Sequence, residues 1–245
     1  MARFQRFLIQ DLSWFIHLLI NKKMANNLVQ SMFDALVHVG HKAEFWNPKM
    51  KPFLFAKKKG VWVFDLEKSA DHLDKAEKFL KAIKLQNKKV LFVGTKPQAA
   101  YQIEKLIAGK GHYYVDKKWT PGLLTNFKEL RRRIDHYLTL KSQFETGEIN
   151  KYTKKEVAGF RKDLDKLHAS YGGVAEMRSK PDVVIVLDAV VDRLAIDEAV
   201  NAKIATIAIL DANANPDGVD FPIPGNDDAL KSLDFLVNRL LDCLA

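Results

Sequence analysis

The sequence predicts an α/β fold in which a parallel sheet is flanked by helices and interrupted by an inserted antiparallel coiled-coil helical hairpin. Three apolar runs of strand length, 90–93, 183–188 and 204–210, occur along the chain with helical segments between them. Continuous apolar runs of this kind are typical of strands buried on both faces, as in a parallel sheet covered by helices. The hairpin is predicted by two heptad patterns between residues 121 and 172.

The N-terminal half begins with a helical pattern over 25–38. Two short alternating apolar runs follow within 53–66 and flank a Lys-Lys-Lys-Gly sequence, which predicts a β-hairpin. Apolar residues on one face predict a helix over 66–86.

The first buried strand is expected at 90–93. Thr95 and Pro97 then suit the start of a helix that runs to about Leu106, with Thr95 as its cap. A further short strand is expected at 112–115.

The predicted hairpin consists of two helices whose apolar residues are spaced alternately by three and four. Thr153 and Glu156 form a capping-box signature at the start of the second helix. The seam residues are Leu123, Phe127, Leu130, Ile134 and Tyr137 in the first helix and Val157, Phe160, Leu164, Leu167 and Tyr171 in the second.

Three parts of the chain follow from these patterns. A sheet domain is expected from 24–120 and 173–245, with the coiled-coil hairpin at 121–172 between its halves. Residues 1–23 are predicted to be a helical extension whose apolar face packs on something, and which is too short and too polar to span a bilayer; a targeting peptide is the alternative.

The charge is unevenly distributed. The net charge is +9, yet residues 181–245 hold 4 Lys and Arg against 12 Asp and Glu, so that residues 1–180 carry a net +17. A basic body of this size attracts polyanions, and an anionic membrane is the competing partner. Cys243 is the only cysteine, which excludes an intrachain disulfide and favours a reducing compartment.

Enzyme motifs are incomplete in this sequence. The run that starts at Gly109 lacks the third glycine of a dinucleotide fingerprint, and Phe-Val-Gly-Thr-Lys lacks the upstream glycine of a phosphate loop. His38 and His41 have metal-ligand spacing but no third ligand nearby, so we expect no metal site.

The aspartate-rich segment 209–228 raises the question of a catalytic site beyond a strand. Pro216-Asp217-Gly218 predicts a turn, and Pro222 and Pro224 predict a rigid loop. Asn226 is expected to cap the last helix, with Asp227 and Asp228 in its first turn. Asp211 and Asp220 are left without a structural role, and a catalytic pair, a cation site and plain loop architecture are the alternatives.

Two segments, 40–60 and 116–133, combine Lys and Arg with aromatic residues, the combination that structured RNA requires of a protein. The candidate RNA-binding residues are His41, Lys42, Trp46, Asn47, Lys49, Lys51, Lys57, Lys58, Lys96, Lys117, Lys118, Trp119, Asn126, Lys128, Arg131, Arg132 and Arg133.

Several blocks, in order, resemble the family of the second protein of the small ribosomal subunit, in its bacterial or organellar form. They are GHKAEFWNPKMKPFLFAKKKGVWVFDLEKS, LFVGTKPQA, KWTPGLLTNFKELRRRI, KPDVVIVLD and ILDANANPDGVDFPIPGNDDA. The resemblance implies a Rossmann-like or flavodoxin-like sheet with an inserted coiled coil. It also implies a structural role in translation, in which the protein binds small-subunit rRNA and neighbouring ribosomal proteins.

On this reading the protein is not an enzyme, takes no small-molecule substrate, does not bind a membrane and has no cofactor, apart from structural Mg²⁺ held through RNA. We expect it on ribosomes of an organelle matrix, such as that of a mitochondrion, or of a bacterial cytoplasm. The alternatives are a small-molecule α/β enzyme that uses Asp211 and Asp220, and a non-ribosomal RNA-binding module.

Overall fold

The computed structural model describes residues 27–108 and 111–244. The predicted extension at 1–23, and Gly109 and Lys110 of the incomplete dinucleotide motif, lie outside the described residues.

Within the described residues the main sheet has five parallel strands in the order β5-β4-β6-β7-β8. β4 is the first strand of this sheet in the sequence, the next strand, β5, lies on one side of it, and β6, β7 and β8 follow on the other side. This is the flavodoxin-like strand order, and its switch point lies between β4 and β6. The strands are β4 (Val90–Val93), β5 (Tyr113–Val115), β6 (Val183–Val186), β7 (Ala205–Leu210) and β8 (Phe221–Pro224).

Alternate residues of these strands pack into two apolar cores. On one face, the side chains of Phe92 and Ile185 pack under α3, α4, α5 and α9. On the other face, those of Leu91 and Val184 pack against α8 and the base of the helical hairpin. The helices are α3 (Asn27–Asp34), α4 (Leu66–Leu85), α5 (Pro97–Leu106), α8 (Arg193–Asn201) and α9 (Leu230–Asp242).

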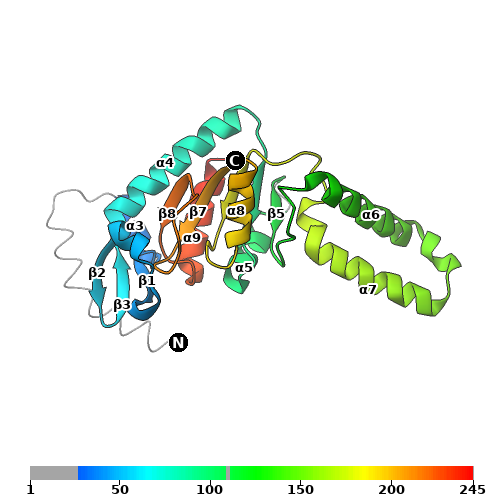
Figure 1. The fold of residues 1–245 in the computed structure, drawn as a ribbon, viewed down its shortest axis with the longest axis horizontal. Helices are drawn as coiled ribbons and strands as arrows, with labels where there is room; N and C mark the ends of the chain where they lie inside the picture. The colour runs from blue at the N-terminus through cyan, green and yellow to red at the C-terminus, as the bar shows by residue number, and fades with distance from the viewer. Residues whose placement is uncertain (1–26, 109–110, 245) are drawn as a thin grey trace.

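A small antiparallel sheet with the order β1-β3-β2 lies beside the N-terminal end of α4 (Figure 1). Its strands are β1 (Val39–Lys42), β2 (Leu54–Lys58) and β3 (Val61–Phe64), and the 3₁₀ segments Ala43–Phe45 and Pro48–Phe53 join β1 to β2. The predicted β-hairpin at 53–66 is confirmed: Lys59 and Gly60 both have positive φ, as its tight turn requires. The sequence did not predict β1.

The helical hairpin projects from the sheet (Figure 1). It consists of α6 (Phe127–Thr146) and α7 (Lys154–Tyr171), joined by the 3₁₀ turn Glu148–Lys151 and followed by a second 3₁₀ turn, Gly172–Val174. The predicted capping box at Thr153 and Glu156 is present. Leu123 precedes α6 and packs in the core beside the sheet, so the helical part of the predicted seam starts at Phe127.

Three local predictions were wrong. Thr95 does not cap α5, because its N-cap is Lys96. The segment of Pro222 and Pro224 is strand β8, where the prolines are tolerated because β8 is at the edge of the sheet. The last helix begins at Leu230, after a turn in which Asn226 Oδ1 accepts hydrogen bonds from the backbone of Asp228 and Ala229.

None of the helices in the described part of the chain is both long enough and apolar enough to cross a membrane.

Candidate nucleic-acid interface

Lys96 lies at the carboxyl edge of the sheet, inside a group of aspartates. Its ammonium nitrogen is 2.9 Å from Asp188, 2.7 Å from Asp227 and 2.7 Å from Asp228, and its side chain is 16% exposed. The three carboxylates raise the pKa of Lys96 and outweigh the effect of burial, which lowers it. Lys96 therefore neutralises charge within the protein.

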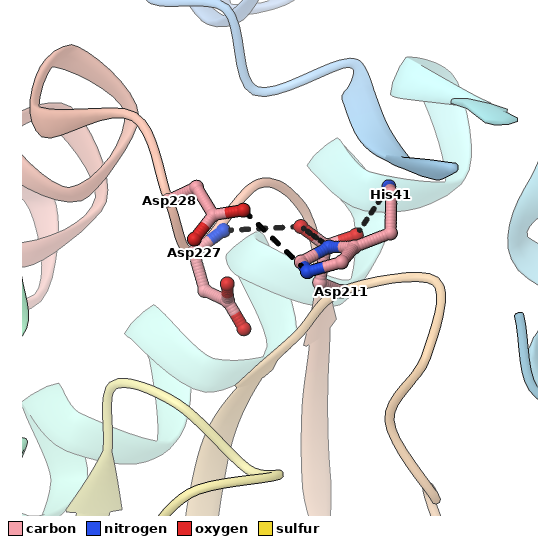
Figure 2. Close-up of side chains that lie close together, drawn as sticks. All are labelled: His41, Asp211, Asp227 and Asp228. Carbon is pink, nitrogen blue, oxygen red and sulfur yellow. Dashed lines mark hydrogen bonds and ion pairs between the residues drawn. The ribbon is translucent and has the colours of Figure 1, made fainter. Parts of the chain in front are cut away.

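His41 enters the same group from β1 (Figure 2). Its backbone N–H donates to Asp211 Oδ1 at 3.0 Å. Its ring nitrogens make ion-pair contacts, Nδ1 at 3.1 Å from Asp211 Oδ2 and Nε2 at 3.5 Å from Asp228 Oδ2. The contact with Asp211 raises the pKa of His41 to about 9, while burial raises the pKa of Asp227 to about 8. At neutral pH His41 is therefore positively charged and Asp227 is mostly protonated, and both effects limit the negative charge of this aspartate cluster.

His41, Asp211, Asp227 and Asp228 each offer a ligand atom, and these atoms lie within 4.8 Å of one another. An imidazole nitrogen with carboxylate oxygens is a donor set that divalent cations accept. Cation binding would require His41 to lose its proton and would compete with the Lys96 ammonium at Asp227 and Asp228. His38 is not part of this arrangement, because its ring stacks on Phe33 at 4.3 Å, so the predicted spacing of the two histidines does not bring them to one site.

The switch point between β4 and β6 is where doubly wound folds bind their ligands. Here the chain's own side chains occupy it. Thr95 donates from its backbone N–H and its hydroxyl to Asp192, at 2.9 and 2.7 Å. Asp188 Oδ1 accepts the backbone N–H groups of Val190 and Val191 at 2.8 and 2.9 Å. These carboxylates hold loops together at the point where an enzyme of this fold would bind substrate.

Asp211 and Asp220, the carboxylates considered as a catalytic pair, lie at opposite ends of β7. Asp220 Oδ2 accepts the backbone N–H of Thr206, near the start of the strand, at 2.9 Å. Asp211 directly follows its end. Because a strand rises about 3.3 Å per residue, the two carboxylates are roughly 15 to 20 Å apart. They form no pair, and each has a structural role.

Many of the candidate RNA-binding residues are exposed. Lys117 and Lys118 precede the turn before α6, and Arg132 lies on the outer side of α6 with Glu129 at 3.1 Å. The exposed members are Lys42, Lys49, Lys51, Lys57, Lys117, Lys118, Asn126, Lys128, Arg132 and Arg133, and Lys58 is half-buried.

Other candidates make contacts within the protein. Arg131 donates to the carbonyl oxygens of Ala175 and Met177 at 3.0 and 2.9 Å and pairs with Asp135. Trp119 is 7% exposed. Trp46 packs on Trp62, the Asn47 side chain accepts the backbone N–H of Lys49, and the Lys49 ammonium pairs with Asp217.

Glu198 was not singled out by the sequence, although its carboxylate accepts the hydrogen bond from Trp119 Nε1 at 3.1 Å. A glutamate in a short amphipathic helix usually faces solvent, so no sequence signal distinguished it.

The model of the family described as ribosomal protein S2 matches residues 32–245. The chain belongs to the ribosomal protein S2 family. Three relatives illustrate the similarity. The small ribosomal subunit protein uS2 of Pseudoalteromonas translucida is 41% identical over 217 residues, covering 89% of this chain and 90% of that protein.

The corresponding protein of Buchnera aphidicola is 44% identical over 212 residues, covering 86% of this chain and 93% of its own. The small ribosomal subunit protein uS2c of Cyanophora paradoxa is 38% identical over 221 residues, covering 90% and 95%. The predicted family and its α/β fold with a parallel sheet are thereby confirmed. The ribosomal protein S2 family consists of structural proteins and not of enzymes.

Proposed function

We propose that this chain is a structural protein of the small ribosomal subunit that binds the subunit's rRNA and neighbouring ribosomal proteins in translation. The family match over residues 32–245 carries this proposal. The relatives are named as small-subunit proteins, and this chain covers nine-tenths or more of the length of the three compared above.

We assign the rRNA contact to the exposed cations of the two basic segments. Phosphate groups are held by solvated Lys and Arg side chains, and cations already paired inside the protein contribute less. Lys117, Lys118, Lys128 and Arg133 are exposed on and around the start of α6, and we take them together as the candidate contact region. Mg²⁺ would then reach the protein through the bound RNA, and no cofactor of the protein's own is proposed.

Sedimentation tests this function. Tagged protein should migrate with small subunits in a sucrose gradient and remain bound through a wash of moderate salt. A soluble pool whose melting temperature rises with added nucleotides would instead support a small-molecule enzyme. Association with RNA that is not small-subunit rRNA would support a non-ribosomal RNA-binding module.

A further inference from the structure

A single buried carboxylate holds the turn formed by residues 119–125. Glu198 of α8 is 5% exposed, and its Oε1 accepts hydrogen bonds from Trp119 Nε1 at 3.1 Å and from the Gly122 backbone at 2.7 Å. Its Oε2 accepts from the Leu124 backbone at 3.1 Å and from the backbone and hydroxyl of Thr125 at 3.3 and 3.2 Å. The donors come from one turn that is 73 to 79 residues away in sequence.

The donors described for this carboxylate are neutral groups, so its charge is balanced by oriented N–H and O–H dipoles. Burial alone would raise the pKa of Glu198, but the hydrogen bonds from Gly122, Trp119, Leu124 and Thr125 hold it below its usual range. Glu198 is therefore ionised at neutral pH. Hydrogen bonds to a buried charge are stronger than neutral ones, and their loss leaves a costly unpaired group.

Both ends of this turn lead to exposed cations. Lys117 and Lys118 directly precede Trp119, and Thr125 is followed by Asn126, the N-cap of α6, and then by Lys128. Gly122 has φ of +91°, which fits a tight reversal between the two ends. The shape of the turn therefore determines how far apart the two groups of cations lie.

We propose that Glu198 is a positioning residue for RNA binding, which holds the 119–125 turn in the shape that presents Lys117, Lys118 and Lys128 together to the rRNA backbone. This inference rests on the proposed function, because it takes small-subunit rRNA as the partner.

The chain offers a matched pair of variants. Glu198→Gln replaces one acceptor oxygen by an NH₂ group, which then faces N–H donors of the turn. Asp197→Asn makes the same charge change at the neighbouring position of α8, where Asp197 pairs with Arg193 at 2.9 Å. A general effect of net charge would appear in both variants, whereas a positioning effect appears only in Glu198→Gln.

The experiment measures the affinity of the full chain for small-subunit rRNA as a function of salt. Removing two phosphate contacts in Lys117→Ala/Lys118→Ala should make the slope of log K against log salt shallower by about 1 to 2. Glu198→Gln should produce a reduction of similar size, and Asp197→Asn none. Combining Glu198→Gln with both lysine changes should add nothing further, because a displaced turn no longer uses those lysines.

Additive slopes in the combined variant, or a wild-type slope in Glu198→Gln, would overturn the positioning role. So would a wild-type slope in Lys117→Ala/Lys118→Ala, because the turn would then carry no phosphate contact. In these cases the wild-type chain still binds the rRNA and the proposed function stands. If the wild-type chain does not bind small-subunit rRNA, the proposed function itself fails.

Thr125→Val serves if Glu198→Gln does not fold, because it removes one hydroxyl donor from an exposed residue and keeps the side-chain volume. The slope of log K against log salt for Thr125→Val should fall between those of the wild type and of Lys117→Ala/Lys118→Ala. In a chain that already carries both lysine changes, Thr125→Val should not change the slope. An effect that persists without the lysines would overturn the inference. In ¹⁵N spectra the Trp119 indole N–H resonance should shift in either variant and not in Asp197→Asn.

Discussion

His38 and His41 are three residues apart, yet their surroundings make one neutral and the other positively charged at neutral pH. His38 is 2% exposed, and burial lowers its pKa to about 4. His41 contacts Asp211, which raises its pKa to about 9. The first is a neutral core residue stacked on Phe33, and the second is a cation among carboxylates.

His38 makes stability depend on pH. Because its pKa falls from 6.5 in the unfolded chain to about 4 in the folded protein, the unfolded state binds the extra proton between these values. Stability is therefore lost as the pH falls from about 6.5 to about 4. His38→Leu should remove this loss, worth roughly 3 kcal/mol at the acid end.

Urea unfolding at a series of pH values checks this prediction. The comparison above about pH 8, where His38 is neutral in both states, gives the effect of the substitution without the protonation of the histidine. Parallel curves of unfolding free energy against pH for the variant and the wild type would contradict it.

Asp220, directly before β8, forms hydrogen bonds with Thr206 near the start of β7. Its carboxylate accepts the backbone N–H and the hydroxyl of Thr206, a residue with no exposed surface. Asp220→Ala leaves these donors without the carboxylate, so the free energy of unfolding should fall by about 1 to 3 kcal/mol. Asp220→Asn keeps one acceptor oxygen and should cost less.

Chemical denaturation measures both Asp220 variants. RNA affinity should be unchanged in them, because the Asp220 carboxylate bonds Thr206 inside the fold and belongs to neither basic segment. Equal stability of Asp220→Ala and wild type would show that Thr206 finds other partners.

At the scale of elements, the two hairpin helices are buried unequally. Leu130, Ile134 and Tyr137 of α6 are buried, whereas Val157, Phe160, Leu164 and Leu167 of α7 are only partly covered. Leu130 and Ile134 also belong to the core that contains the sheet, so α6 is anchored to the sheet while α7 depends largely on α6.

This asymmetry predicts unequal costs for the same kind of truncation. Ile134→Ala, at a position with no exposed surface, should lower the free energy of unfolding by about 2 to 5 kcal/mol. Leu164→Ala removes a half-buried side chain and should cost clearly less. Its effect should appear as faster hydrogen exchange confined to α7, with the sheet unchanged.

Denaturation and residue-resolved hydrogen exchange measure the two truncations together. A larger cost for Leu164→Ala than for Ile134→Ala would show that the seam, and not the anchor to the sheet, stabilises the hairpin.

At the scale of the molecule, charge is separated along the chain: residues 181–245 are acidic and residues 1–180 are basic. The acidic part supplies Asp188, Asp211, Asp227 and Asp228, which contact Lys96 and His41 within the fold. Much of the remaining basic charge lies on the surface, where it is available to a polyanion.

The start of α6 offers a test of that surface. Arg131 binds the carbonyl oxygens of Ala175 and Met177, so reversing its charge would disturb folding as well as binding. Arg132→Glu/Arg133→Glu changes only exposed positions. It should weaken rRNA binding across sequences and lower the salt slope by about 1 to 2, with little change in melting temperature.

Filter binding at several salt concentrations measures this effect. The exposed pair Lys154→Glu/Lys155→Glu on the far end of the hairpin makes the same charge change and serves as a control for position. Equal losses in both variants would mean that net charge, and not this surface, determines affinity.

The sequence by itself determined the parallel sheet, the helical hairpin and the family. Continuous apolar runs, alternating three- and four-residue spacings and a capping box are local patterns, and their physical cause lies within one segment. The signature blocks are also local stretches of sequence, and the occurrence of several of them in one order was specific to one family.

Only the tertiary structure decided the roles of the individual polar residues. Lys96 and Arg131 are of the same residue types as the exposed cations of the basic segments. Their partners come from other segments of the chain, such as Asp227 for Lys96 at 131 positions away. Glu198 likewise meets its donors across more than seventy residues. The sequence gives the type of each charged side chain, but the partner and the exposure of that side chain depend on which distant segments the fold brings together.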